Sequence, residues 1–198
     1  MLAKEEFPKS YYSYRFAWAL IHPFRRLITN PFRLIKAADV KEKMKVLELG
    51  CGPGYFTQAL AQKVGKKGKI YAHDIQTEMI TKAKNRSRNF KIKNNINFLH
   101  SNSTNLSLAD ESIDLIFACN VFEEIDKQKQ TSLTTKELLR IAKPNTTLFV
   151  KEHAAYVGKK RIKRIYSQIK NEGFKQQKTF NTLFSYYATF IKENGTNG

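Results

Sequence analysis

The chain has 198 residues and a net charge of +18, with 41% hydrophobic and 26% charged residues. This length and composition are typical of one globular domain and exclude a disordered or fibrous protein. No apolar run approaches the roughly 20 residues of a membrane-spanning helix. The two cysteines, Cys51 and Cys119, form no disulfide or zinc-binding pattern. We therefore expect a cytoplasmic protein without a structural metal.

The excess of positive charge lies in the two flanks of the chain. Residues 46–150 hold 15 basic and 10 acidic residues, whereas residues 1–45 and 151–198 together hold 20 and 7. Such a basic protein can attract RNA, an anionic membrane surface or an acidic small molecule. A compositional bias explains the charge equally well, because the chain is also rich in Lys, Asn and Ile.

Residues 1–44 are predicted to form an N-terminal cap or arm. Aromatic residues and arginines alternate there, and Pro23 and Pro31 divide any long helix into short pieces. An apolar face at helical spacing would dock on the domain or, as an alternative, lie on a membrane surface. The residues of this face are Tyr12, Phe16 and Leu20.

Residues 45–198 alternate short β-rich runs with helical periodicity, which predicts one α/β domain. We expect a three-layer sandwich with a seven-stranded, mostly parallel sheet. The last two strands are joined without a helix, so they should pair as a hairpin and make one strand antiparallel. The predicted strands are 45–49, 69–73, 96–100, 113–119, 147–151, 174–180 and 186–191. The predicted helices are 55–64, 77–90, 131–142 and 159–171.

The strongest motif is a glycine-rich loop, residues 48–54 (ELGCGPG), between the first strand and the first helix of this domain. Glycines allow a nucleotide-like ligand to approach the backbone and the helix N-terminus closely. Asp74 ends the second strand, where a carboxylate can accept both hydroxyls of a ribose. The spacing G-x-G-x-G differs from the G-x-G-x-x-G of dinucleotide-binding proteins.

This loop resembles the (D/E)-x-G-x-G-x-G motif of class I S-adenosylmethionine-dependent methyltransferases. The resemblance covers nearly the whole chain and is closest to the small ubiquinone/menaquinone-biosynthesis type (methyltransferase type 11). It implies a Rossmann-like fold, S-adenosylmethionine as cofactor and S-adenosylhomocysteine as product. Asp74 would bind the ribose, and Asn102 with Ser103 the adenine. The cofactor-binding residues that the resemblance implies are Glu48, Gly50, Cys51, Gly52, Gly54, Asp74, Ile75, Asn102, Ser103 and Asn120.

Three positions depart from the pattern of that family. Asn102 replaces an aspartate that binds the adenine amino group, although an amide oxygen can still accept that hydrogen bond. Asn145 and Thr146 replace a Gly-Gly turn, and residues 122–124 (FEE) stand where a histidine is frequent. These changes leave a second hypothesis open, in which the chain is a non-catalytic, cofactor-binding scaffold.

Glu124 and Glu152 are the candidate catalytic residues. They follow the fourth and fifth strands, at the sheet edge where ligands bind in this fold, and both resemble acids in a subset of small methyltransferases. Either could act as a general base for a weakly acidic acceptor, and a solvated charge or a helix cap would explain each of them as well.

A small molecule is the predicted methyl acceptor. RNA adenine methyltransferases stack the target base with an Asn-x-Pro-aromatic motif after the fourth strand, whereas this chain has residues 120–123 (NVFE) there. The proline is missing, and a glutamate at that point would repel a phosphate backbone. An RNA or lipid methyltransferase that uses the basic flanks remains the alternative.

Overall fold

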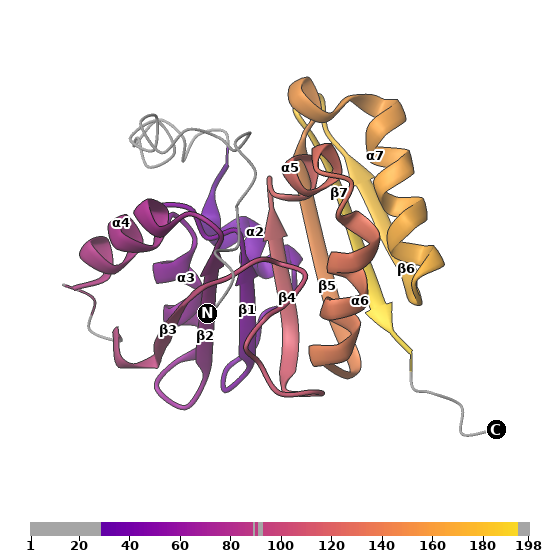
Figure 1. Cartoon of the computed structure of the whole chain (residues 1–198). Helices are drawn as coiled ribbons and strands as arrows, with labels where there is room; N and C mark the ends of the chain where they lie inside the picture. The colour runs from indigo at the N-terminus through magenta and orange to yellow at the C-terminus, as the bar shows by residue number, and fades with distance from the viewer. Residues whose placement is uncertain (1–28, 89, 91–92, 194–198) are drawn as a thin grey trace, which may run out of the picture.

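A computed structural model describes residues 29–88, 90 and 93–193 of the protein. A single seven-stranded sheet forms its centre, with the order β3-β2-β1-β4-β5-β7-β6, and helices cover both faces (Figure 1). The strands are β1 (Lys45–Leu49), β2 (Lys69–Asp74), β3 (Ile96–His100), β4 (Ile113–Cys119), β5 (Ala142–His153), β6 (Phe174–Asn181) and β7 (Ser185–Lys192). The helices are α2 (Pro31–Ala37), α3 (Thr57–Val64), α4 (Thr77–Ser87), α5 (Phe122–Lys127), α6 (Thr131–Ile141) and α7 (Ala154–Asn171), with a short 3₁₀ helix, η2 (Lys93–Asn95).

The predicted Rossmann-like architecture is confirmed. β1 to β5 pair in parallel, while β7 is antiparallel to both β5 and β6. The short connection between β6 and β7 forces this reversal, because only a crossover connection can return the chain for a parallel pair. Because β1 pairs in parallel with β2 and with β4, the carboxyl ends of these three strands lie together at one end of the sheet.

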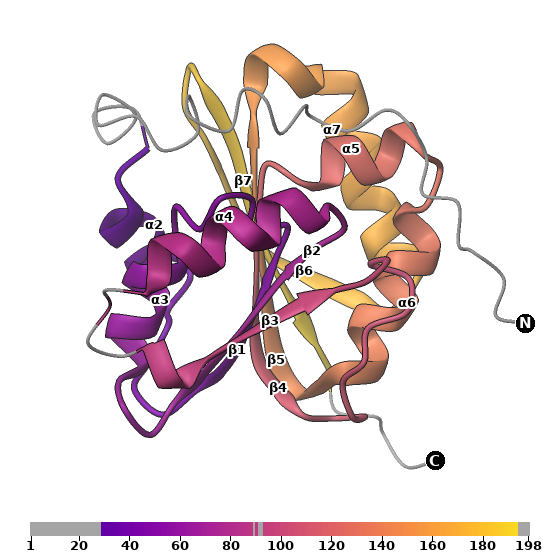
Figure 2. The ribbon, with the colours of Figure 1, turned by 60° about the vertical axis from the view of Figure 1, so that its left-hand side comes forward.

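Apolar residues alternate along the strands and build a core on each face. In β1, Val46 belongs to the core under α2, α3 and α4, whereas Leu47 belongs to the core under α5, α6 and α7. Figure 2 shows these two helical layers on opposite sides of the sheet. No described helix is long and apolar enough to cross a membrane.

Three elements that follow β4 differ most from the prediction. The six-residue α5 was not predicted, because it is too short to show helical periodicity. β5 begins at Ala142 rather than at residue 147, and its pairing with β4 shifts between Ile113 and Leu115. Asn145 lies in this irregular part with φ +65°, a conformation that the family's glycine would adopt without strain. α7 begins before the predicted helix, and non-helical Gly158 separates the two parts.

Only residues 29–44 of the predicted cap are described, and they pack against the domain. The side chain of Asn30 caps α2, and Pro31 is the first residue of that helix, where its fixed φ favours a helix start. Leu34 and Ile35 join the core around α3. The predicted apolar face of Tyr12, Phe16 and Leu20 lies outside the described residues, as does Pro23.

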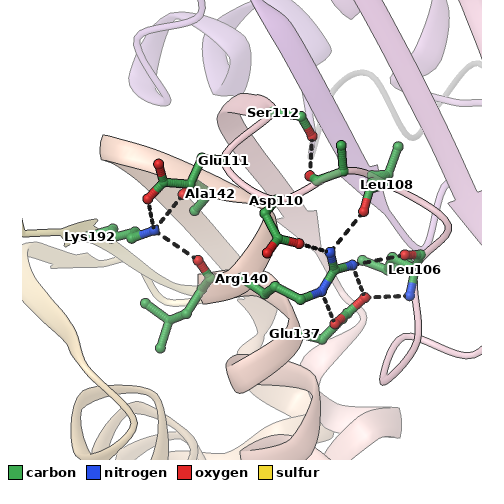
Figure 3. Close-up of polar contacts among 11 residues, drawn as sticks. Leu106, Leu108, Asp110, Glu111, Ser112, Glu137, Arg140, Ala142 and Lys192 are labelled. Carbon is green, nitrogen blue, oxygen red and sulfur yellow. Dashed lines mark hydrogen bonds and ion pairs between the residues drawn. The ribbon is translucent and has the colours of Figure 1, made fainter.

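The long segment between β3 and β4 is held in place by Arg140 of α6 (Figure 3). The guanidinium donates to the carbonyl oxygens of Leu106 (3.0 Å) and Leu108 (2.9 Å) and pairs with Asp110. Glu137 pairs with Arg140 and accepts the Leu106 N–H (2.6 Å). Because Asn102 and Ser103 lie near the start of this segment, the network fixes the backbone beyond two predicted cofactor-binding residues.

We expect Arg140→Ala to lower the free energy of unfolding by about 1–3 kcal/mol, because it removes charged hydrogen bonds to two backbone carbonyls. Lys136→Ala is the matched control on the same helix, since Lys136 makes an exposed ion pair with Glu172 at 3.7 Å and no other polar contact among the described residues. That variant should stay within about 0.5 kcal/mol of the wild type. Urea denaturation measures both, and equal losses would show that the network does not anchor the segment.

Candidate active site

A pocket of about 370 Å³ lies at the carboxyl ends of β1, β2 and β4. Ligands bind at this edge in open α/β sheets, and the volume suits a small-molecule site. Most of the predicted site residues meet there. Those that line the pocket are Gly50, Cys51, Gly52, Asp74, Ile75, Ser103, Asn120 and Glu124.

The glycine loop forms one wall of the pocket. Its path requires glycine at three positions, because a side chain there would be strained. Gly50, Gly52 and Gly54 have φ values of +69°, +53° and +80°, in the region that L-residues rarely adopt. A Cβ on Gly50 would also approach Val121 Cγ2 to 2.6 Å. A Cβ on Gly54 would lie 3.3 Å from the backbone of α4 at Ala83, outside the pocket lining.

Asp74 connects the glycine loop to the start of α4. Its Oδ2 accepts the Gly52 N–H (2.8 Å) and its Oδ1 accepts the Gln76 N–H (2.9 Å). Burial raises the pKa of Asp74, while the hydrogen bonds from Gln76 and Gly52 oppose that shift. Each carboxylate oxygen keeps a further lone pair, so Asp74 can still accept hydrogen bonds from a ligand in the pocket.

Glu48 lies behind the loop rather than in the pocket wall. It is buried, and its Oε2 accepts a hydrogen bond from the Thr57 hydroxyl (2.6 Å) at the start of α3. Burial raises the pKa of Glu48 to about 8, so the carboxyl is mostly protonated at neutral pH. Its Oε1 has no hydrogen-bond partner among the described residues.

His73 is a pocket residue that the sequence analysis missed. The buried ring donates from Nε2 to the Ser101 carbonyl oxygen (2.9 Å). Since a carbonyl can only accept, Nδ1 is left as an acceptor, and it has no partner among the described residues. Burial lowers the pKa of His73 to about 4, so the ring is neutral. The sequence signal that could have identified His73 is its position next to Asp74 at the end of β2.

The two residues predicted to bind adenine take different positions. Ser103 lines the pocket and shares a hydrogen bond with the Thr134 hydroxyl (2.8 Å). Asn102 is not part of the lining, and its Oδ1 accepts the Thr104 N–H (3.1 Å) within its own turn. The amide oxygen keeps a further lone pair, so it could still accept a hydrogen bond from a nearby ligand.

The two predicted catalytic acids are separated. Glu124 of α5 lines the pocket, where its carboxylate pairs with Lys127 (2.8 Å). Glu152 lies outside the lining and is buried, and its Oε1 accepts the N–H groups of Val121 (3.0 Å) and Phe122 (2.9 Å). These contacts position the start of the helix that carries Glu124. Burial raises the pKa of Glu152 to about 7, while the two backbone hydrogen bonds oppose the shift.

Asn120 ends the wall at β4 in a left-handed conformation (φ +57°). Its Oδ1 accepts a hydrogen bond from the buried Lys151 ammonium (2.9 Å).

Cys51 is also buried, and burial raises the pKa of its thiol well above the usual range. The Cys51 side chain is therefore a packing residue of the loop, not a reactive thiolate.

The fold and the glycine loop define a class I methyltransferase, and the comparisons with known proteins agree. The chain belongs to a methyltransferase-domain family that matches residues 40–191. A SAM-dependent methyltransferase from Aquifex aeolicus has the same fold, with a TM-score of 0.83 and 24% identity over 92% of this chain and 100% of its own. The predicted class and its cofactor, S-adenosylmethionine, are confirmed.

Part of the chain is similar to curated relatives of the predicted group. The ubiquinone/menaquinone biosynthesis C-methyltransferase UbiE of Haemophilus ducreyi is 29% identical over 119 residues, and the one of Shewanella woodyi is 30% identical over the same length. Each alignment covers 60% of this chain and 44% or 46% of the relative. The chain therefore spans less than half the length of these relatives.

The neutral, buried His73 makes stability depend on pH in a defined direction. Below the ordinary histidine pKa of about 6.5, His73 of the unfolded chain binds a proton. In the folded chain, His73 stays neutral until about pH 4. Stability should therefore fall as the pH drops through this window, by about 2 kcal/mol at pH 5 from His73 alone.

His73→Asn should remove that contribution from the difference in unfolding free energy between pH 7.5 and pH 5, measured by denaturation at both pH values. Leu133→Ala, at an exposed residue of α6 that does not titrate, is the control and should keep the wild-type difference. A His73→Asn protein with the full wild-type pH dependence would show that His73 is protonated in the folded state.

Proposed function

We propose that the protein transfers a methyl group from S-adenosylmethionine to a ring carbon of a small aromatic acceptor, of the hydroquinone type found in quinone biosynthesis. The observation that carries this proposal is that the glycine loop, Asp74 and Glu124 line the same pocket. The names of the UbiE relatives support the kind of acceptor.

In this proposal the glycine loop and Asp74 hold the cofactor. Gly50 and Gly52 offer close backbone approach, and Asp74 accepts the ribose hydroxyls with its remaining lone pairs. The unpartnered Nδ1 of His73, a residue of the pocket lining, supports a ligand that brings a hydrogen-bond donor to this end of the sheet. Ser103 and Ile75 are the proposed adenine contacts. Bound S-adenosylmethionine supplies a methyl group activated by a positively charged sulfur.

The rest of the pocket suits an aromatic acceptor. Tyr55, Phe56, Met79 and Ile125 contribute apolar surface to the lining. A ring carbon becomes a good nucleophile when a neighbouring hydroxyl gives its proton to Glu124, the proposed base. That carbon takes the methyl group as the sulfur–methyl bond breaks to leave S-adenosylhomocysteine. It then releases its ring proton to restore the aromatic ring, so that one proton is given up overall. Glu152 and Lys127 are positioning residues, because Glu152 fixes the start of α5 and Lys127 pairs with the Glu124 carboxylate.

The cysteines support a cytoplasmic location for this reaction. Cys51 and Cys119 are both buried and are not joined in a disulfide, which fits a reducing compartment.

The test is a methyl-transfer assay with isotope-labelled S-adenosylmethionine and hydroquinones that lack one ring methyl group. Mass spectrometry should find the label on a ring carbon. Glu124→Gln should lower kcat by about 100-fold or more while cofactor affinity stays unchanged, because only the base is lost. Glu78→Gln, at an exposed acid of α4 outside the pocket lining, is the control and should keep wild-type turnover.

Two results would contradict the proposal. Wild-type kcat in Glu124→Gln would exclude Glu124 as the base. Cofactor binding without label transfer to any hydroquinone, catechol or RNA would favour the non-catalytic scaffold.

A further inference from the structure

Four large apolar side chains are exposed together at the carboxyl end of the sheet, beyond β5. Leu183 is 84% exposed, Tyr156 69%, Phe184 58% and Phe180 44%. Tyr156 comes from the start of α7, Phe180 from the end of β6, and Leu183 and Phe184 from the β6–β7 turn. Figures 1 and 2 show these segments at the same end of the sheet. The Ala154 N–H donates to the Phe184 carbonyl oxygen (2.9 Å), so the turn lies directly against α7. We call these four residues the hairpin-tip surface.

The β6–β7 turn, which carries Leu183 and Phe184, is ordered by its own hydrogen bonds. The Thr182 hydroxyl accepts the N–H groups of Phe184 (3.3 Å) and Ser185 (3.1 Å). The Phe180 ring stacks on Tyr187 with a centroid distance of 4.5 Å and an angle of 7°. Exposure of Leu183 and Phe184 is therefore a property of an ordered turn, and adjacent exposed apolar groups of this size mark an interaction surface.

A cluster of positive charge begins next to this surface. Gly158 interrupts α7, and residues 159–164 (KKRIKR) follow it. Arg161 and Arg164 pair with Asp126 on α5. Lys159, Lys160 and Lys163 are exposed and have no ion-pair partner among the described residues. These three ammonium groups are available to an anionic partner.

We infer that the hairpin-tip surface and the three lysines dock the protein on an anionic lipid bilayer. Apolar side chains that enter the headgroup region, flanked by lysines that face acidic lipids, are the two components of peripheral membrane binding. Leu183, the most exposed of the four at 84%, is aliphatic, which suits insertion among lipid chains better than stacking on a base.

Docking would turn the mouth of the pocket toward the membrane. Tyr156 belongs to the hairpin-tip surface and also lines the pocket, and its ring lies 5.0 Å from that of His153. An apolar acceptor could then pass from the bilayer into the pocket. This consequence rests on the proposed function, whereas the docking itself does not.

The experiment is co-sedimentation of the full chain with vesicles of phosphatidylcholine and phosphatidylglycerol, beside vesicles of phosphatidylcholine alone. We expect binding to the anionic vesicles that weakens as salt rises from about 50 to 200 mM. Leu183→Ser with Phe184→Ser should weaken binding at least tenfold, an order-of-magnitude expectation from the loss of two inserted side chains. The matched control is Leu133→Ser with Phe32→Ser, which removes the same residue types at 57% exposure elsewhere and should keep wild-type binding.

A second pair of variants tests the charge. Lys159→Glu with Lys160→Glu should weaken binding by roughly tenfold, whereas Lys66→Glu with Lys67→Glu should change it by less than about twofold, although the net charge is the same. Equal losses in the two pairs would show that the total charge alone attracts the vesicles and would overturn the inference.

Two further outcomes would also overturn it. Phe184→Leu keeps an apolar side chain but removes a stacking ring, so it should preserve vesicle binding. If it instead abolishes tight binding of single-stranded RNA, the surface is an RNA site. If light scattering shows a dimer that Leu183→Ser dissociates without loss of vesicle binding, a second copy of the chain covers the surface.

Discussion

The site depends on one hydrogen bond between two strand ends, from the Gly52 N–H to Asp74 Oδ2. The parallel pairing of β1 and β2 brings these ends together, and the bond fixes the glycine loop against the start of α4. The loop can follow that path only because Gly50 and Gly54 carry no side chain toward Val121 and Ala83. The same aspartate therefore shapes the loop and presents its remaining lone pairs to the pocket.

A second buried carboxylate positions the opposite wall. Glu152 accepts both N–H groups at the start of α5 and thereby fixes the helix that brings Glu124 to the pocket. Burial of Glu152 and of Glu48 raises the pKa of each carboxyl, which is the energetic cost of placing acids inside the fold. The hydrogen bonds that these groups accept offset part of that cost and give the loops around the pocket a defined geometry.

The sequence predicted the features that depend on local pattern. The seven strands, the antiparallel β7 and the conformation of the glycine loop follow from apolar runs, short connections and glycine spacing. Features that depend on contacts between distant residues were not predictable in this way. The unpartnered nitrogen of His73 requires the carbonyl of Ser101, and the role of Glu152 requires the backbone of α5. For Asn102, the family pattern could not reveal that its own turn uses the amide oxygen.

Calorimetric titration with S-adenosylhomocysteine tests the central claim, that Asp74 and the glycine loop form the cofactor site. The account predicts one binding site in the wild type and at least about tenfold weaker binding in Asp74→Asn, since charge-assisted hydrogen bonds to the ribose are lost. Asp114→Asn is the control, because Asp114 contacts Lys45 and Lys143 away from the pocket lining. No wild-type binding at about millimolar ligand, or Asp74→Asn affinity within about a factor of two of the wild type, would contradict the account.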